Sequence, residues 1–205
     1  GEPGFAGRMV TGDLDRDGTD ELLVAASRSA GRLPVVYVYD PALLAEAAPV
    51  CNSDTPDPLA SIVPGAGALD VECGDACDFG VALAVGDIAT DDDGPEVFVG
   101  APGAAVDGVT EAGAVYIYRG ADLIGGGQAT VAGRVAHSSP VSTSNFGGGL
   151  AVAPMAGRNE LLVGMTGKGK LAVVYCTGVG EDLEAGGDVT TNLDGSVIST
   201  RCRPD

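Results

Sequence analysis

Three stretches of this sequence repeat one pattern, and this repetition constrains the fold more than any other feature. Each stretch opens on a phenylalanine, continues through an apolar run and a loop, and resumes with a glutamate and a second apolar run. These landmarks are Phe5, Phe79 and Phe146, and Glu21, Glu96 and Glu160. A third apolar run follows in every stretch, at 35–39, 114–118 and 171–175. A chain with such an internal repeat is expected to fold as an array of similar units.

The apolar runs have the chemistry of β-strands. The third run of each unit is five residues long, rich in β-branched and aromatic residues, and bounded by Gly, Pro or Asp. Fainter fourth strands are predicted at 59–63, 129–132 and 188–191. The 33 glycines and 12 prolines suit short strands joined by tight turns. Four short antiparallel strands per unit, repeated in tandem, predict an all-β protein made of β-propeller blades.

We expect about three blades. The first covers residues 1–78, with a Pro- and Asp-rich insertion at 41–58; the second covers 79–145, and the third covers 146–205 together with the start of a following connector. Because propellers usually need at least about four blades, three would leave two open faces. Self-association or further blades would cover them. The residues expected on these faces are Leu22, Val24, Val97, Val99, Leu161 and Val163.

The loop that starts at Asp13 is typical of a calcium site. Counting Asp13 as position 1, carboxylates stand at positions 1, 3 and 5, and a glycine at position 6 permits a sharp turn. Calcium prefers six to eight oxygen ligands, and carboxylates this close would repel one another without a cation. An EF-hand is excluded because its position 12, normally a glutamate, is Val24 here. The predicted ligands are Asp13, Asp15, Asp17, the backbone carbonyl of Thr19, and Glu21; the alternative is a solvated acidic turn.

The equivalent loops of the other two units are less regular. The second loop offers Asp87, Asp91, Asp93 and Glu96, but Ala89 stands where the first loop has Asp15. A second calcium ion there would need a distorted or water-completed site. The third loop, 153–160, lacks these carboxylates and carries an arginine, so we expect it to hold no ion.

Two short motifs resemble a known family. Phe79-Gly80 opens the second unit, Gly100-Ala101-Pro102 follows its second strand, and the unit ends in Gly-Ala-Val-Tyr-Ile-Tyr at 113–118. The chain is therefore similar to the FG-GAP repeats of the integrin α-subunit propeller and of many bacterial secreted proteins. The resemblance implies that Glu21 closes the calcium site at position 9. It also implies a secreted or cell-surface module that binds a protein or glycan ligand, as in adhesion. Two alternatives remain: an accessory or catalytic domain of a secreted hydrolase or lyase, and a structural spacer.

Composition limits the partners. Eleven Lys and Arg stand against 29 Asp and Glu, for a net charge of −18. This charge repels phosphate backbones and anionic membranes, so neither nucleic acid nor membrane insertion is expected. No apolar run approaches the ~20 residues of a membrane helix. His137, the only histidine, is expected in a surface loop, and no catalytic motif surrounds it, so we expect no enzyme.

Five cysteines favour an oxidising compartment. Cys73 and Cys77 are close enough in sequence to form a local disulfide; a zinc site is the alternative, although no second close cysteine pair exists. At most one further bridge can form among the other three cysteines. Proximity along the chain favours Cys176–Cys202, and whichever pair forms, one of the three thiols stays free.

Overall fold

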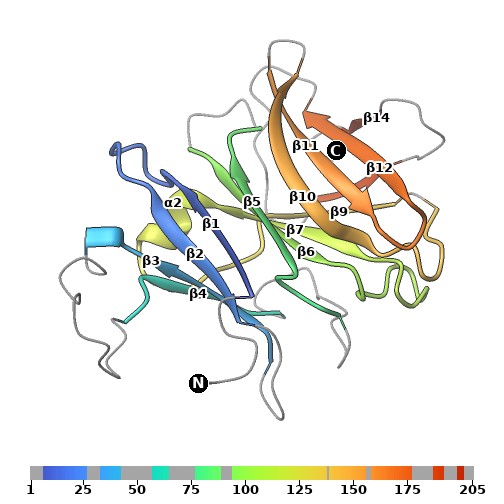
Figure 1. Cartoon of the computed structure of the whole chain (residues 1–205), viewed down its shortest axis with the longest axis horizontal. Helices are drawn as coiled ribbons and strands as arrows, with labels where there is room; N and C mark the ends of the chain where they lie inside the picture. The colour runs from blue at the N-terminus through green and yellow to red at the C-terminus, as the bar shows by residue number, and fades with distance from the viewer. Residues whose placement is uncertain are drawn as a thin grey trace.

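The structure, a computed structural model, describes residues 7–26, 33–42, 57–64, 77–88, 94–137, 139–155, 158–176, 187–191 and 198–200. These residues form three sheets, and the short helix α2 (Gly120–Ile124) follows a strand of the second (Figure 1). The prediction of an all-β fold is therefore confirmed. No helix in the described part of the chain is long and apolar enough to cross a membrane.

The three sheets follow one another along the chain and are mainly antiparallel. Sheet 1 has the order β1 (Arg8–Gly12), β2 (Glu21–Ala26), β3 (Val35–Tyr39), β4 (Ala60–Ile62) and β8 (Gly127–Gln128). Sheet 2 has the order β5 (Ala82–Gly86), β6 (Glu96–Ala101), β7 (Ala114–Arg119), β9 (Gly133–His137) and β13 (Gly187–Thr191). Sheet 3 has the order β10 (Phe146–Met155), β11 (Arg158–Met165), β12 (Lys170–Cys176) and β14 (Ile198–Thr200).

One of the predicted fourth strands was wrong, and another belongs to a different sheet than expected. The fourth strand of sheet 2 is β9, and residues 129–132 form a connector instead, in which Ala129, Val131 and Ala132 are buried. This connector is apolar because it packs between sheets, where Ala129 N donates to Ser61 O and Ala132 N donates to Ile117 O. The segment predicted at 188–191 is a strand, but as β13 it pairs in parallel with β9 rather than with sheet 3. Likewise, β8 follows sheet 2 in sequence and pairs with β4 of sheet 1.

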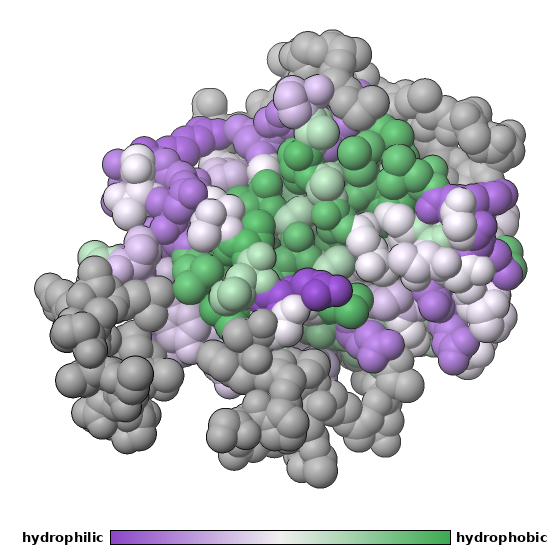
Figure 2. All heavy atoms as spheres, in the orientation of Figure 1, coloured by the Kyte–Doolittle hydropathy of each residue, from purple (hydrophilic) through white to green (hydrophobic). Residues whose placement is uncertain are grey.

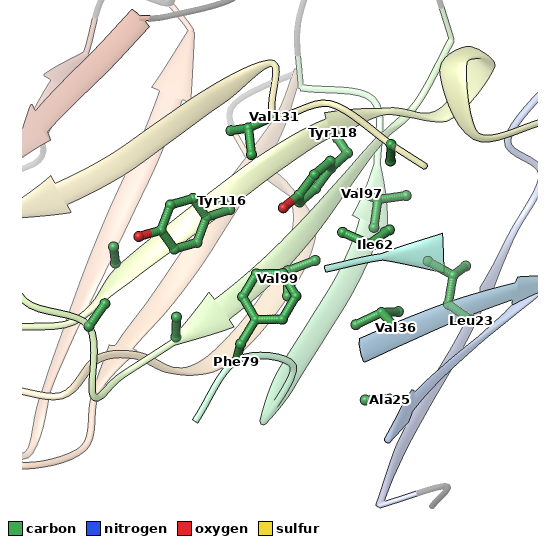
Figure 3. Close-up of a cluster of buried hydrophobic side chains, with 14 of the residues drawn as sticks. Leu23, Ala25, Val36, Ile62, Phe79, Val97, Val99, Tyr116, Tyr118 and Val131 are labelled. Carbon is green, nitrogen blue, oxygen red and sulfur yellow. The ribbon is translucent and has the colours of Figure 1, made fainter. Parts of the chain in front are cut away.

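Sheet 2 lies between the other two sheets and contributes to two separate cores. In β6, Val97 and Val99 point into the core shared with sheet 1, and Phe98 points into the core shared with sheet 3. Strand β7 alternates in the same way, with Tyr116 and Tyr118 on the side of sheet 1 (Figure 3). Because both faces are covered, every residue of β6 is buried, which explains its continuous apolar run.

The sheets pack through equivalent faces. We call the face that packs on the following sheet the forward face, and the opposite one the backward face. The forward faces of sheets 1 and 2 carry Leu23, Val36 and Val38, and Phe98, Val115 and Ile117. The backward faces of sheets 2 and 3 carry Val97, Val99, Tyr116 and Tyr118, and Leu161, Val163, Ala172 and Val174.

This packing buries most of the residues that the sequence analysis expected on open faces. Val97, Val99, Leu161 and Val163 are 0% exposed and lie between sheets within the chain. Leu22 and Val24 lie on the backward face of sheet 1, on which no further sheet of the described chain packs, but Val24 is only 4% exposed. The other outer face is the forward face of sheet 3, with Leu162, Leu171 and Val173, which the sequence analysis did not identify.

Each Phe-Gly pair lies against the sheet that precedes it. Phe79 and Phe146 are 2% and 0% exposed, and each is followed by a glycine with a positive φ angle, 82° at Gly80 and 87° at Gly147. A Cβ atom on Gly80 would lie 3.2 Å from Val36 Cγ2, and one on Gly147 would lie 3.3 Å from Val115 Cγ2. Val36 and Val115 occupy equivalent positions, so the two Phe-Gly pairs make the same packing contact with the preceding sheet.

The first strands of the units also meet in a repeated way. A Cβ atom on Gly12 would lie 2.4 Å from Val85 Cγ1, and one on Gly86 would lie 2.5 Å from Val152 Cγ1. Both glycines end the first strand of a unit, and both valines belong to the first strand of the next unit. Strand β1 therefore packs on β5, and β5 packs on β10, at distances that only glycine permits.

Candidate metal site at the first acidic loop

The loop between β1 and β2 brings three predicted ligands together. Carboxylate oxygens of Asp13, Asp15 and Glu21 all lie within 4.8 Å of one another. The ladder between the strands ends at the pair Gly12–Glu21, so residues 13–20 must turn back within eight residues. The glutamate is 5% exposed, Asp13 is partly buried, and Asp15 is exposed. The cluster therefore opens to solvent on one side, from which an ion can enter.

Hydrogen bonds from the loop backbone hold the aspartates. Asp17 N donates to Asp13 Oδ1 at 3.0 Å and to Asp15 Oδ1 at 3.1 Å, and Gly18 N donates to Asp13 Oδ2 at 2.9 Å. The tight turn needs positive φ angles at Arg16 and Gly18. The Asp17 carboxylate accepts from Thr19 N at 2.7 Å and is not part of the three-residue cluster. The structure thus brings together three of the five predicted ligands, and the roles of Asp17 and Thr19 stay predictions.

Glu21 is the buried end of the cluster. Its Oε2 accepts a hydrogen bond from Leu14 N at 2.8 Å, and the Leu14 side chain is 0% exposed. Burial raises the pKa of Glu21; the hydrogen bond from Leu14 lowers it, and the negative charges of Asp15 and Asp17 raise it further. The loop also lies against the start of α2, because a Cβ atom on Gly120 would lie 2.8 Å from Leu14 O.

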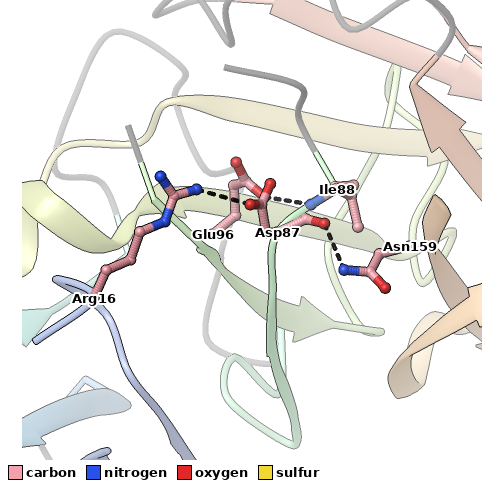
Figure 4. A network of polar contacts seen from close by, with 5 residues as sticks. All are labelled: Arg16, Asp87, Ile88, Glu96 and Asn159. Atoms are coloured by element: carbon pink, nitrogen blue, oxygen red, sulfur yellow. Dashed lines mark hydrogen bonds and ion pairs between the residues drawn. The ribbon is translucent and has the colours of Figure 1, made fainter. Parts of the chain in front are cut away.

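The second loop repeats the buried glutamate. Ile88 N donates to Glu96 Oε2 at 2.9 Å, as Leu14 N does to Glu21, and Glu96 is 2% exposed. However, the carboxylate of Asp87 forms an ion pair of 2.8 Å with Arg16 of the first loop (Figure 4). Asp91 and Asp93 lie outside the described residues, so the second calcium site stays a prediction.

The third unit has a closed hairpin at this position. Pairing continues beyond Ala153–Glu160 to Pro154–Asn159 and Met155–Arg158. Asn159 Nδ2 donates to Asp87 O at 2.9 Å, so this hairpin also contacts the second loop. The sequence analysis missed Arg16 and Asn159 as partners of Asp87, because they come from other units and no local pattern relates them.

The remaining predicted site residues are the cysteines, and the sequence analysis also singled out His137. Cys77 is 3% exposed. Cys51, Cys73 and Cys202 lie outside the described residues, as does the side chain of Cys176, so the disulfide pairings stay predictions. His137 ends β9 and does not lie in a loop as predicted; its Nδ1 accepts from Ser139 N at 2.9 Å. Burial, together with the charge of Lys170, lowers the pKa of His137.

Comparison of the chain with models of known protein families and with curated proteins finds no match. The geometry of the first loop and the packing of the three sheets are therefore the basis for a functional conclusion.

Proposed function

We propose that the chain is a calcium-stabilised module of FG-GAP-like β-propeller units that binds a protein or glycan ligand outside the cell. The observation that carries the proposal is the cluster of Asp13, Asp15 and Glu21, whose carboxylate oxygens lie within 4.8 Å of one another. Three carboxylates at this distance repel one another, and a divalent cation removes the repulsion.

The donor set fits calcium. All three side chains offer hard oxygen atoms, and calcium accepts six to eight such ligands in flexible geometry. Two of them are already oriented by backbone hydrogen bonds from Asp17 and Gly18, so little ordering would accompany binding. The site would hold the loop between β1 and β2 in place, and its role would be structural.

The repeated packing supports the propeller interpretation. Equivalent faces meet twice, each Phe-Gly pair lies against the preceding sheet, and the first strands of successive units adjoin. A repeat array of this kind commonly binds its ligand through loops on one face. The ligand itself is inferred from the resemblance to FG-GAP proteins, because a fold does not determine a function.

A calcium titration tests the metal site. Chelator-treated protein should melt at a higher temperature as calcium is added, because an ion that binds only the folded state stabilises it. Asp15→Asn should remove most of this response while keeping the oxygen that accepts from Asp17 N. Asp20→Asn is the matched control, because Asp20 is an exposed residue of the same loop outside the cluster. No thermal shift in millimolar calcium would refute the proposal.

A further inference from the structure

Successive residues of the first acidic loop serve two different contacts. Asp13 and Asp15 belong to the carboxylate cluster, and Figure 2 shows a hydrophilic surface around this loop. The residue between them, Leu14, is 0% exposed and belongs to the hydrophobic core that sheets 1 and 2 share. The next residue, Arg16, forms an ion pair of 2.8 Å with Asp87 of the second unit. Positions 13 and 15 thus serve the candidate metal site, and positions 14 and 16 contact the second unit.

The second unit holds Leu14 through two glycines. A Cβ atom on Gly120, the first residue of α2, would lie 2.8 Å from Leu14 O and 3.2 Å from Leu14 Cβ. A Cβ atom on Gly94 would lie 3.3 Å from Leu14 O. Gly120 N donates to Pro95 O at 2.9 Å, and its Cβ atom would lie 2.6 Å from that oxygen. Any side chain at position 120 would therefore have to displace α2 or the loop.

The backbone of Leu14 connects this contact to the carboxylates. Leu14 N donates to Glu21 Oε2 at 2.8 Å, and Leu14 directly follows Asp13 in the chain. Movement of Leu14 away from α2 would therefore shift Asp13 and break the hydrogen bond to Glu21, both of which belong to the cluster. Within the described residues, the second unit contributes no carboxylate to the cluster, but it holds in place the segment that carries two of them.

The interface between the second and third units repeats this arrangement. Ile88 takes the place of Leu14: its N donates to Glu96 Oε2 at 2.9 Å, and its side chain is 5% exposed in the core that sheets 2 and 3 share. Asn159 Nδ2 of the third unit donates to Asp87 O at 2.9 Å. At both interfaces, the loop of one unit is therefore attached to the unit that follows.

We propose that the second unit positions the metal site through the contact between Gly120 and Leu14, so that ion binding and the docking of the first unit on the second stabilise each other. The inference rests on the proposed calcium site and couples that site to an interface between units. An ion that holds Asp13 and Glu21 together favours the loop conformation in which Leu14 fits against α2. By linkage, the docked second unit raises the affinity for the ion. The ion pair between the two loops contributes less, because solvent screens it.

The calcium affinity of Gly120→Ala in the full chain tests the proposal. Calorimetric titration should find a loss of about fivefold or more, although Gly120 lies outside the acidic loop. Gly100→Ala is the matched control, because Gly100 is also a buried glycine of the second unit and its Cβ atom would collide with Gly147 O of the third. This control should destabilise the chain and leave its calcium affinity unchanged.

Hydrogen exchange of the unaltered protein tests the coupling without a substitution. Calcium should slow exchange of the Gly120 amide, which donates to Pro95 O beside Leu14. It should slow less the exchange of the Phe146 amide, which donates to Ala112 O at the interface between the second and third units. NMR resolves both amides. General stabilisation would slow both equally, so a difference between them reports coupling at the first interface.

The outcomes separate this inference from the proposed function. An unaltered chain that binds no calcium would refute the proposed function and the inference with it. In a chain that binds calcium, three results would each overturn the inference alone: an unaltered affinity in Gly120→Ala, an equal loss in Gly100→Ala, or equal slowing of both amides. Circular dichroism checks that the variants fold, and where one does not, the amide exchange of the unaltered protein decides.

Discussion

The β1–β2 and β10–β11 hairpins are equivalent strand pairs of the first and third units, but they end in different ways. Gly12 pairs with Glu21 in the first hairpin, and Ala153 pairs with Glu160 in the third; both glutamates are 5% exposed. In the third hairpin the ladder continues for two more pairs. In the first it stops, and the loop 13–20 is held by hydrogen bonds from its backbone to its own aspartates.

The difference shows two solutions to one problem, which is how to satisfy backbone groups at the end of a hairpin. Continued pairing uses the partner strand and needs no charge. The acidic loop uses carboxylates as acceptors, and this leaves three negative groups close together, one of which is the buried Glu21. A cation would stabilise the second solution and have no effect on the first. The predictions below test this contrast, from the largest expected effect to the smallest.

Replacing the acidic loop of the first hairpin by the end of the third hairpin should abolish the calcium response. We replace residues 13–20 by Pro-Met-Ala-Gly-Arg-Asn, the sequence of residues 154–159. At calcium concentrations of about 100 times Kd, the unaltered chain should gain about 2.7 kcal/mol of stability, and the graft should gain none. The melting temperature with and without chelator measures both. The graft loses the buried Leu14 and so melts lower in either condition; an unchanged calcium response would place the ion elsewhere.

Replacing each buried glutamate in turn should distinguish the acidic loop of the first hairpin, where calcium affinity should fall, from the closed end of the third hairpin, where it should not change. Glu21→Gln removes a charge from the cluster but keeps an oxygen that can accept from Leu14 N. We expect an affinity loss of about tenfold or more, equivalent to about 1.4 kcal/mol. Calorimetric titration measures this loss. Glu160→Gln is the control and should leave calcium affinity unchanged. Equal losses in both variants would contradict a calcium site that belongs to the first hairpin alone.

Removing the ion pair between the first and second loops should have a small effect. The side chains of Arg16 and Asp87 are 47% and 39% exposed, so solvent screens their 2.8 Å contact. Arg16→Gln should lower the free energy of unfolding by about 1 kcal/mol or less. Denaturant titration of the single and double variants with Asp87→Asn measures the coupling. A coupling well above this value would mean that the pair organises the first loop.

The titration of the sole histidine should report its burial and the charge of Lys170. Burial and the nearby Lys170 lower the pKa of His137, so the folded state disfavours its protonated form. Stability from this group is present above the ordinary pKa of 6.5 and is lost as pH falls through the lowered pKa. NMR should find the lowered pKa, and Lys170→Gln should raise it. A His137 pKa above the ordinary value would mean that the acidic loops dominate the local field.

Several features followed from the sequence alone. The repeated apolar runs predicted the first three strands of each unit, because β-branched and aromatic residues favour extended backbone. The spacing of Asp13, Asp15 and Glu21 predicted that they would come together, because they belong to one short loop between two paired strands. Both predictions concern local structure, which neighbouring residues determine.

Tertiary structure decided the rest. Residues 129–132 are apolar like a strand but serve as a connector, and burial by another sheet is not visible in local sequence. Val97 and Leu161 were expected on open faces and lie between sheets, whereas Leu171 lies on a face that remains open. Asp87 meets Arg16 and Asn159 from two other units. These outcomes depend on which face of each sheet meets its neighbour, and that is determined by long-range packing that no single repeat encodes.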